Sequence, residues 1–199
     1  MKLIENLSTF DWYLIIVNIV GFVAYLINMI LYKYTANGQI DAVLTILSLM
    51  GGSAGIVLAI LLFDRKSVKE NMMSRVFVIS VLVVQIVIFL VIKGHHADKM
   101  TLAFWTFFNQ HKIILIYLAI INVVTFVVYA VDKHLAIEGK QRIRIITLLG
   151  LAFIGGSIGG LLAMYLFRHK TQKDYFTVGV PLIIIMQIVV LIYSMNAGW

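Results

Sequence analysis

Residues 155–171 read GGSIGGLLAMYLFRHKT, and the rest of the chain is organised around this stretch. It begins as an apolar run broken by glycines and ends abruptly in Arg168, His169 and Lys170. Residues 51–66 read GGSAGIVLAILLFDRK, and 9 of these 16 positions are identical to those 104 residues later, with no gap. The two runs are therefore interpreted as copies of one another.

The similarity extends toward the N-terminal side of both runs. The same offset of 104 aligns residues 13–25 with residues 117–129, and 8 of these 13 positions are identical. Self-similarity at a constant offset predicts an internal duplication. The predicted organisation is a first, degenerate repeat at 1–93, an interfacial linker at 94–112 and a second repeat at 113–199.

Composition places the chain in the membrane. It has 199 residues, of which 62% are hydrophobic and 13% charged, with a mean hydropathy of +1.01. A soluble domain has about 45–50% apolar and about 25% charged residues, so an all-α, multi-pass membrane protein is predicted. The net charge of +7 is attributed to basic loops that face an anionic leaflet, and no nucleic-acid partner is expected. Since cysteine is absent, disulfides and thiolate metal sites are excluded.

Each predicted repeat contains three apolar segments, and the middle one is rich in glycine. The six segments are 13–32, 40–63, 76–92, 113–131, 145–167 and 176–193. The linker carries four aromatic residues within 104–108, which suits either a short helix at the headgroup boundary or an ordinary aromatic loop.

The glycines of the middle segments allow two architectures. In the first, each middle segment turns back at Gly51-Gly52 or Gly155-Gly156. Four helices then span the membrane, and two hairpins enter it and return to the same side. In the second, six helices span and the repeats are inverted. The glycines then serve close helix packing, because Gly55 and Gly159 follow Gly51 and Gly155 at the small-xxx-small spacing.

Basic residues distribute differently in the two architectures. The six-span arrangement divides them 9:7 between the sides. The re-entrant arrangement divides them 12:4, which agrees better with the positive-inside rule. Its basic side holds Lys33, Arg65, Lys66, Lys69, Arg75, Lys133, Lys140, Arg142, Arg144, Arg168, Lys170 and Lys173, and its other side holds Lys2, Lys93, Lys99 and Lys112.

The second repeat carries a recognisable series of motifs. They are Asp132-Lys133, Ala136, Gly139, Arg142-Ile143, Gly155-Gly156-x-x-Gly159, Arg168-His169-Lys170-Thr171, Lys173 and Phe176. This series resembles a bacterial membrane family called domain of unknown function 1294, over about residues 117–193. The family pattern continues Arg-Ile with Pro-Glu, where this chain has Arg144 and Ile145. The resemblance implies a bacterial cytoplasmic-membrane protein and supports the site, but it implies no reaction.

The strongest candidate site is the cationic end of the second middle segment. Arg168, His169, Lys170 and Lys173 could bind a phosphate, since Arg offers a planar fork and Lys a point charge. The competing interpretation is a positive anchor that only sets topology. Asp132 and Lys133 belong to the same candidate site. In the re-entrant architecture Asp132 shares a side with Arg168 and His169 and could form a structural ion pair with them, or a catalytic dyad with His169.

Polar residues recur at matching positions inside the spans. Asn18 and Asn122 correspond to one another, as do Tyr25 and Tyr129. Because a buried amide is costly unless it is paired, interhelical hydrogen bonds are expected. The alternative is a polar floor beneath a ligand cavity.

Function is predicted only by class. The leading hypothesis is binding or transport of a small anionic or lipid ligand at the repeat interface. The alternatives are a membrane enzyme acting on a phosphate-bearing headgroup and a non-catalytic interaction protein. Membrane lipids, anionic ones included, are the expected partners, and a homo-oligomer is compatible with this. No cofactor and no metal are expected, although His95, His96, Asp98 and His111 lie in the linker, because adjacent histidines rarely converge on one ion.

Overall fold

A computed structural model describes residues 8–34, 41–64, 71–96 and 100–197. Several residues that the sequence assigned to loops lie outside this part: Lys2, Arg65, Lys66, Lys69, Asp98 and Lys99. The described residues form helices joined by turns and loops, as predicted, and the chain divides into two units, Met1–Gln85 and Ile86–Trp199.

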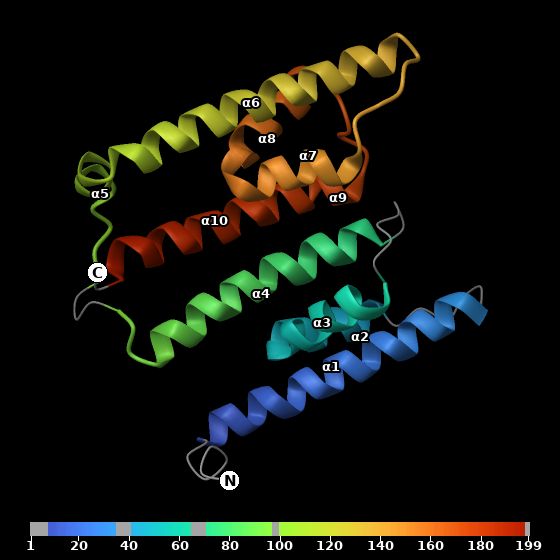
Figure 1. Ribbon diagram of the computed structural model, residues 1–199, viewed down its shortest axis with the longest axis vertical. Helices are drawn as coiled ribbons and strands as arrows, with labels where there is room; N and C mark the ends of the chain where they lie inside the picture. Colours follow the sequence, from blue (N-terminus) through green and yellow to red (C-terminus); the bar gives the residue numbers. More distant parts are fainter. Residues whose placement is uncertain (1–7, 35–40, 65–70, 97–99, 198–199) are drawn as a thin grey trace. The chain divides into compact units, whose positions relative to one another are not determined.

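Unit 1 consists of one long helix, one broken helix and most of a third helix. In chain order these are α1 (Thr9–Tyr34), α2 (Asp41–Leu47), η1 (Ser48–Gly52), α3 (Ser53–Phe63) and α4 (Met72–Ile92), whose last residues belong to unit 2 (Figure 1). A capping box starts α1, because the Asp11 amide donates to the Ser8 hydroxyl and the Ser8 amide donates to the Asp11 carboxylate.

Unit 2 follows the same plan after a short additional helix. Its elements are α5 (Phe104–Gln110), α6 (Lys112–Ile137), α7 (Ile145–Leu151), η2 (Ala152–Gly156), α8 (Ser157–Leu166), α9 (Asp174–Thr177) and α10 (Gly179–Asn196). The aromatic part of the linker is therefore helical. The residues just before α5 are bound to the end of α10, since Thr101 and Asn196 exchange two hydrogen bonds of 2.6 and 3.0 Å.

Within the described residues, six segments are long and apolar enough to cross a membrane, so the protein is a multi-pass membrane protein. The segment Ile145–Leu166 is one of them by length and composition, but hydrogen bonds show that it folds back. The backbone N–H of Ile143, just before α7, donates to one carboxylate oxygen of Asp132 at 2.9 Å. His169, just after α8, binds the other oxygen at 2.8 Å. Both ends of the segment thus meet near the C-terminal end of α6 (Figure 1).

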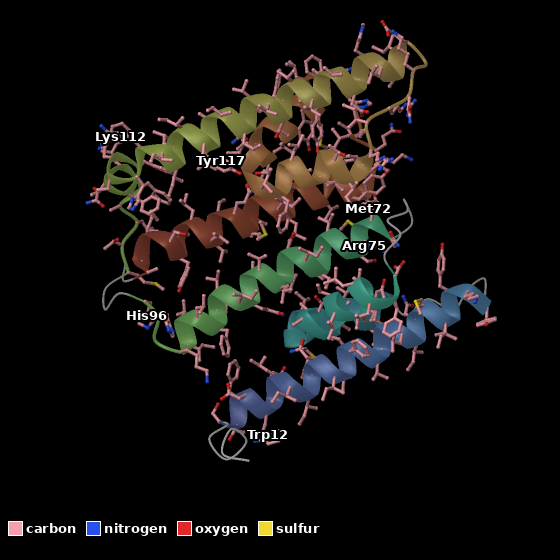
Figure 2. The ribbon with its side chains drawn as sticks, viewed as in Figure 1. Trp12, Met72, Arg75, His96, Lys112 and Tyr117 are labelled. Atoms are coloured by element: carbon pink, nitrogen blue, oxygen red, sulfur yellow. The ribbon has the colours of Figure 1, made fainter. Side chains whose placement is uncertain are left out.

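The middle of this segment lies far from Asp132 along α6. The Tyr117 hydroxyl donates to the carbonyl of Ile154 at 2.6 Å. Tyr117 lies near Lys112 in the N-terminal part of α6 (Figure 2), and 15 residues of helix separate it from Asp132, which is about 22 Å. Each arm of the hairpin is therefore shorter than the roughly 30 Å apolar core of a bilayer. Of the two predicted architectures, the re-entrant one describes unit 2.

The broken helix of unit 1 folds in the same way. Leu44 in α2 and Ile60 in α3 belong to one buried cluster with Tyr25 of α1. At the other end of the hairpin, the Tyr13 hydroxyl donates to the Met50 carbonyl at 2.7 Å. The arms α2 and α3 therefore lie together near Tyr25, and the turn between them lies nearer the N-terminal end of α1.

Glycines serve both roles that the sequence analysis considered. Gly155 has φ 127° and Gly51 has φ 111°, a backbone conformation that favours glycine, and these residues make the turns. Gly159 serves close packing instead, because a Cβ there would lie 2.0 Å from the backbone oxygen of Asn122. Turn and close approach are thus consecutive parts of one hairpin.

The hairpin predicts a simple labelling pattern. The chain has no cysteine, so each introduced cysteine is the single thiol. Gln141 and Gln172 are exposed on either side of the hairpin, and Asn109 is exposed in α5. In oriented vesicles, Gln141→Cys and Gln172→Cys should react with an impermeant thiol reagent from the same side, and Asn109→Cys from the opposite side. Labelling of Gln141→Cys and Gln172→Cys from opposite sides would exclude the hairpin.

Two glycines in the same hairpin should respond oppositely to alanine. Gly159→Ala places a methyl group against the Asn122 backbone and should lower stability by at least about 1–3 kcal/mol, as overpacking does. Gly150→Ala meets no atom within 4 Å and should raise stability by up to about 1 kcal/mol, through helix propensity. Thermal denaturation in detergent measures both. Equal melting temperatures for the two variants would contradict the close approach.

Candidate functional site

A buried carboxylate closes the hairpin of unit 2. Asp132 is 0% exposed near the C-terminal end of α6. It accepts hydrogen bonds from the Ile143 amide, from Nε2 of His169 at 2.8 Å and from Nζ of Lys170 at 2.9 Å. We call Asp132, His169 and Lys170 the latch. Of the two partners expected for Asp132 in the re-entrant architecture, His169 is found, whereas Arg168 has no ion pair within the described residues and Lys170 pairs with Asp132 instead. Together these donors satisfy a charge that would otherwise be costly to bury.

The backbone after α8 is shaped to reach this carboxylate. The amide of His169 donates to the Met164 carbonyl and the amide of Arg168 donates to the Tyr165 carbonyl, which is the Schellman pattern of a helix C-terminus. The left-handed residue of this motif is usually glycine, but here it is Arg168, with φ 47°. Lys170 is also left-handed, with φ 63°. Each such residue costs roughly 1–2 kcal/mol, so His169 is turned back toward α6 at an energetic cost.

Two packed aromatic rings lie beside the latch. Tyr129 and Phe176 are buried, and their rings meet edge to face with centroids 5.8 Å apart. The Tyr129 hydroxyl donates to the Leu148 carbonyl in α7, and Nζ of Lys170 lies 5.0 Å from the centre of the Phe176 ring. The first turns of α7 and α9 are therefore held against α6 at the same level.

The latch also brings together four further cations of this end. Ile143 and His169 bind the two oxygens of one carboxylate, so the loops that carry them meet. Arg142 and Arg144 flank Ile143, Arg168 precedes His169, and Lys173 follows; all four side chains are exposed. No acidic partner is found for any of them within the described ranges. We call Arg142, Arg144, Arg168 and Lys173 the cationic cluster.

Two other basic residues of this end differ from the cluster. Lys133 follows Asp132 on α6 and is half-buried. Lys140 pairs with Glu138 at 2.7 Å, as does His134 at 2.9 Å. Lys140 is thus already neutralised by an acid, which makes it a matched comparison for the unpaired cations.

At the tip of the hairpin, Asn122 joins α6 to the turn segment η2 and to α8. Its amide nitrogen donates to the carbonyls of Leu118 and Gly155 at 2.7 and 2.8 Å. Its carbonyl oxygen accepts from the Gly159 amide at 2.7 Å, and so caps the first turn of α8. Asn18 makes the corresponding bonds to Leu14, Gly51 and Gly55. Both amides are therefore engaged as interhelical connectors.

A third helix completes the tip, through residues that the sequence analysis did not single out. Nε2 of Gln187, on α10, donates to the carbonyls of Ala152 and Phe153 at 2.7 and 3.0 Å, and its oxygen accepts from Ser157. In unit 1, Gln85 donates to the Ser48 carbonyl. A glutamine inside an apolar span was the available signal, because polar groups at membrane depth need partners.

Unit 1 closes its hairpin with different partners. Asp64, at the end of α3, accepts from the Tyr25 hydroxyl at 2.8 Å and pairs with Arg75 at 3.0 Å. Arg75 extends from the first turn of α4 and is buried (Figure 2). At the offset of 104, Asn28 corresponds to Asp132, and Asp64 to Arg168. Of the three latch residues, Asp132 and His169 are thus replaced in unit 1, by Asn28 and Arg65, whereas Lys170 corresponds to Lys66.

The arrangement offers anion-binding groups rather than metal ligands. In the part of the chain that the structure describes, no group of three or more His, Asp or Glu side chains could hold a metal ion. The available chemistry is that of guanidinium and ammonium donors, together with one imidazole held by a carboxylate.

The latch should matter far more than the neighbouring surface pair. Asp132→Ala leaves Lys170 and His169 buried without an acceptor and should lower the free energy of unfolding by about 3–5 kcal/mol. Glu138→Ala removes the more exposed pair at the same end and should change it by about 0–1 kcal/mol. Thermal denaturation in detergent compares the two variants. Similar melting temperatures would show that the latch does not hold the hairpin.

Comparison with known proteins covers this same region. The profile of the family described as "Protein of unknown function (DUF1294)" matches residues 122–176, which include the hairpin and the latch. A curated relative, the uncharacterized protein YsdA of Bacillus subtilis (strain 168), is 40% identical over 79 residues, which are 40% of this chain and 89% of the relative. No solved structure matches the chain. Through its second half, this multi-pass membrane protein belongs to the DUF1294 family.

Proposed function

We propose that the protein binds an anionic, phosphate-bearing lipid headgroup at the cationic cluster of unit 2, in the bacterial cytoplasmic membrane. The observation that carries the proposal is the set of four exposed cations around the latch, for which the described residues provide no acid. The charge of Lys170 is matched by Asp132, so the cluster keeps its positive charge for an external anion. This retains the binding part of the sequence-based hypothesis.

The position of Arg168 supports a specific role. A glycine would occupy the left-handed position at the end of α8 without strain, yet an arginine lies there with φ 47°. Strained residues of this kind gather at functional sites. The guanidinium can form two parallel hydrogen bonds with a phosphate, which a lysine cannot do. Strain therefore coincides with the side chain best suited to phosphate.

The distribution of charge in unit 2 also supports a cytoplasmic location for the latch end. Lys133, Lys140, Arg142, Arg144, Arg168, Lys170 and Lys173 belong to the latch end of the unit, whereas Lys112 starts α6 at the opposite end. Positive residues favour the cytoplasmic side. The cluster would thus lie at the depth of the cytoplasmic headgroups, where anionic lipids are concentrated.

We further propose that the two units are copies of one ancestral unit. Contacts at the hairpin tip recur at the offset of 104: Tyr13 and Tyr117 bind the carbonyls of Met50 and Ile154, and the two asparagines bind equivalent glycines. Unit 1 would then keep the scaffold, while unit 2 carries the site.

The test is lipid retention in native mass spectrometry, with anionic and zwitterionic lipids of equal chain length. Arg168→Lys keeps the charge but removes the fork, and it should reduce retention of the anionic lipid by roughly fivefold, the equivalent of about 1 kcal/mol. Lys140→Ala, which removes a paired cation, should leave retention almost unchanged.

Two outcomes would reject the proposal. Equal retention by Arg168→Lys and Lys140→Ala would mean that the cluster acts as a diffuse topological anchor. Equal retention of anionic and zwitterionic lipids by the unaltered protein would mean that the bound lipid is held by its acyl chains.

A further inference from the structure

The imidazole of His169 has one nitrogen engaged and one available. Nε2 binds the Asp132 carboxylate at 2.8 Å. Nδ1, on the other edge of the ring, has no hydrogen-bond partner within the described part of the chain. It is also absent from the fully buried atoms that lack a partner, and 11% of the side chain is exposed. Nδ1 is therefore not sealed from solvent, and the residues on either side of it in the chain, Arg168 and Lys170, are cationic.

We propose that Nδ1 of His169 donates a hydrogen bond to the phosphate held by the cationic cluster, so that anion binding takes up one proton. This inference rests on the proposed function and deepens it, because it names a ligand-contacting residue and a condition under which the site fills. The shared chemistry is that of an oxyanion, either on a lipid headgroup or free in solution.

The hydrogen bond to Asp132 keeps the His169 ring in place in both its neutral and its protonated form. Asp132 accepts from Nε2–H of both the neutral imidazole and the imidazolium, since both forms carry that proton when Nδ1 is the site that titrates. Only Nδ1 then changes, from a lone pair that repels an anionic oxygen to an N–H that donates to it. Protonation therefore switches the contact to the ligand without moving the ring.

The charges around His169 link protonation of its imidazole to binding of the anion. Asp132 of α6 favours the imidazolium, whereas Lys170 and the four cations of the cluster oppose it. Lys133 on α6 also opposes it, and Asp174 at the start of α9 favours it. The Tyr129 hydroxyl is committed to the Leu148 carbonyl. A bound anion offsets the repulsion from the cluster, so anion binding and protonation should each favour the other.

A purely structural role would not need an imidazole. Lys170 already supplies a cation to Asp132, and the Ile143 amide supplies a further donor. An amide side chain could provide the bond that Nε2 provides. The feature that only histidine adds is a second nitrogen that titrates in the physiological range.

The test measures binding of dioctanoyl phosphatidylglycerol to the protein in detergent, because a phosphodiester keeps its single charge throughout the range from about pH 5.5 to 8. Sulfate replaces the lipid in a second arm, which distinguishes a headgroup site from one for a free anion. Affinity for the lipid should rise as the pH falls, by at most about tenfold per pH unit for one proton. As the pH rises, affinity should fall to the constant level that the cationic cluster provides, because the neutral ring no longer donates.

Variants assign the proton to a residue. His169→Gln keeps a donor for Asp132 and should bind with an affinity independent of pH. His134→Gln changes an exposed histidine at the same end and should keep the dependence of the unaltered protein. Calorimetry of the unaltered protein in buffers of different ionisation enthalpy should show uptake of up to about one proton, and this measurement does not depend on the folding of any variant.

The outcomes separate this inference from the function on which it rests. Absence of lipid binding at every pH would reject the proposed function. Binding that depends on Arg168 but takes up no proton would leave that function standing and overturn the role of His169. A pH dependence that survives in His169→Gln would overturn it as well. If sulfate binds with the same pH dependence and the lipid does not compete with it, the ligand is a free anion.

Discussion

The structure of unit 2 depends on one buried carboxylate with three donors. Asp132 takes a hydrogen bond from the chain before the hairpin and two more from the chain after it. A charge sealed from water is tolerated only when it is paired, and each donor would be costly to leave alone. The carboxylate therefore fixes where the hairpin starts and ends. It also fixes where two basic loops meet.

The tip of each hairpin obeys a related constraint. A helix that breaks inside an apolar environment leaves backbone N–H and C=O groups without partners, and lipid cannot supply any. Asn122 and Tyr117 supply them from α6, and Gln187 supplies them from α10. The flanking helices thus do more than cross the membrane, because their few polar residues are what allows the helix between them to turn.

The two units apply the same solution with different consequences. In unit 1 the acid at the end of the hairpin, Asp64, pairs with Arg75 of the next helix. In unit 2 the acid lies on α6, the long helix before the hairpin, and the residues after the hairpin supply the cations. Arg168 then remains exposed in a strained backbone position. This difference in where the acid lies makes unit 2 the better candidate for a binding site.

The sequence by itself determined the all-helical membrane class, the six apolar segments and the family, because these follow from apolar length, glycine position and motif order. It also singled out Asp132, His169 and the asparagines, since polar groups among apolar ones are costly without partners. Only the tertiary structure decided that the segment around Gly155 turns back, because glycines suit a turn and a close approach equally well. The hydrogen bond from the Ile143 amide to Asp132 was likewise not predictable from the sequence, since every residue except proline carries the same backbone donor.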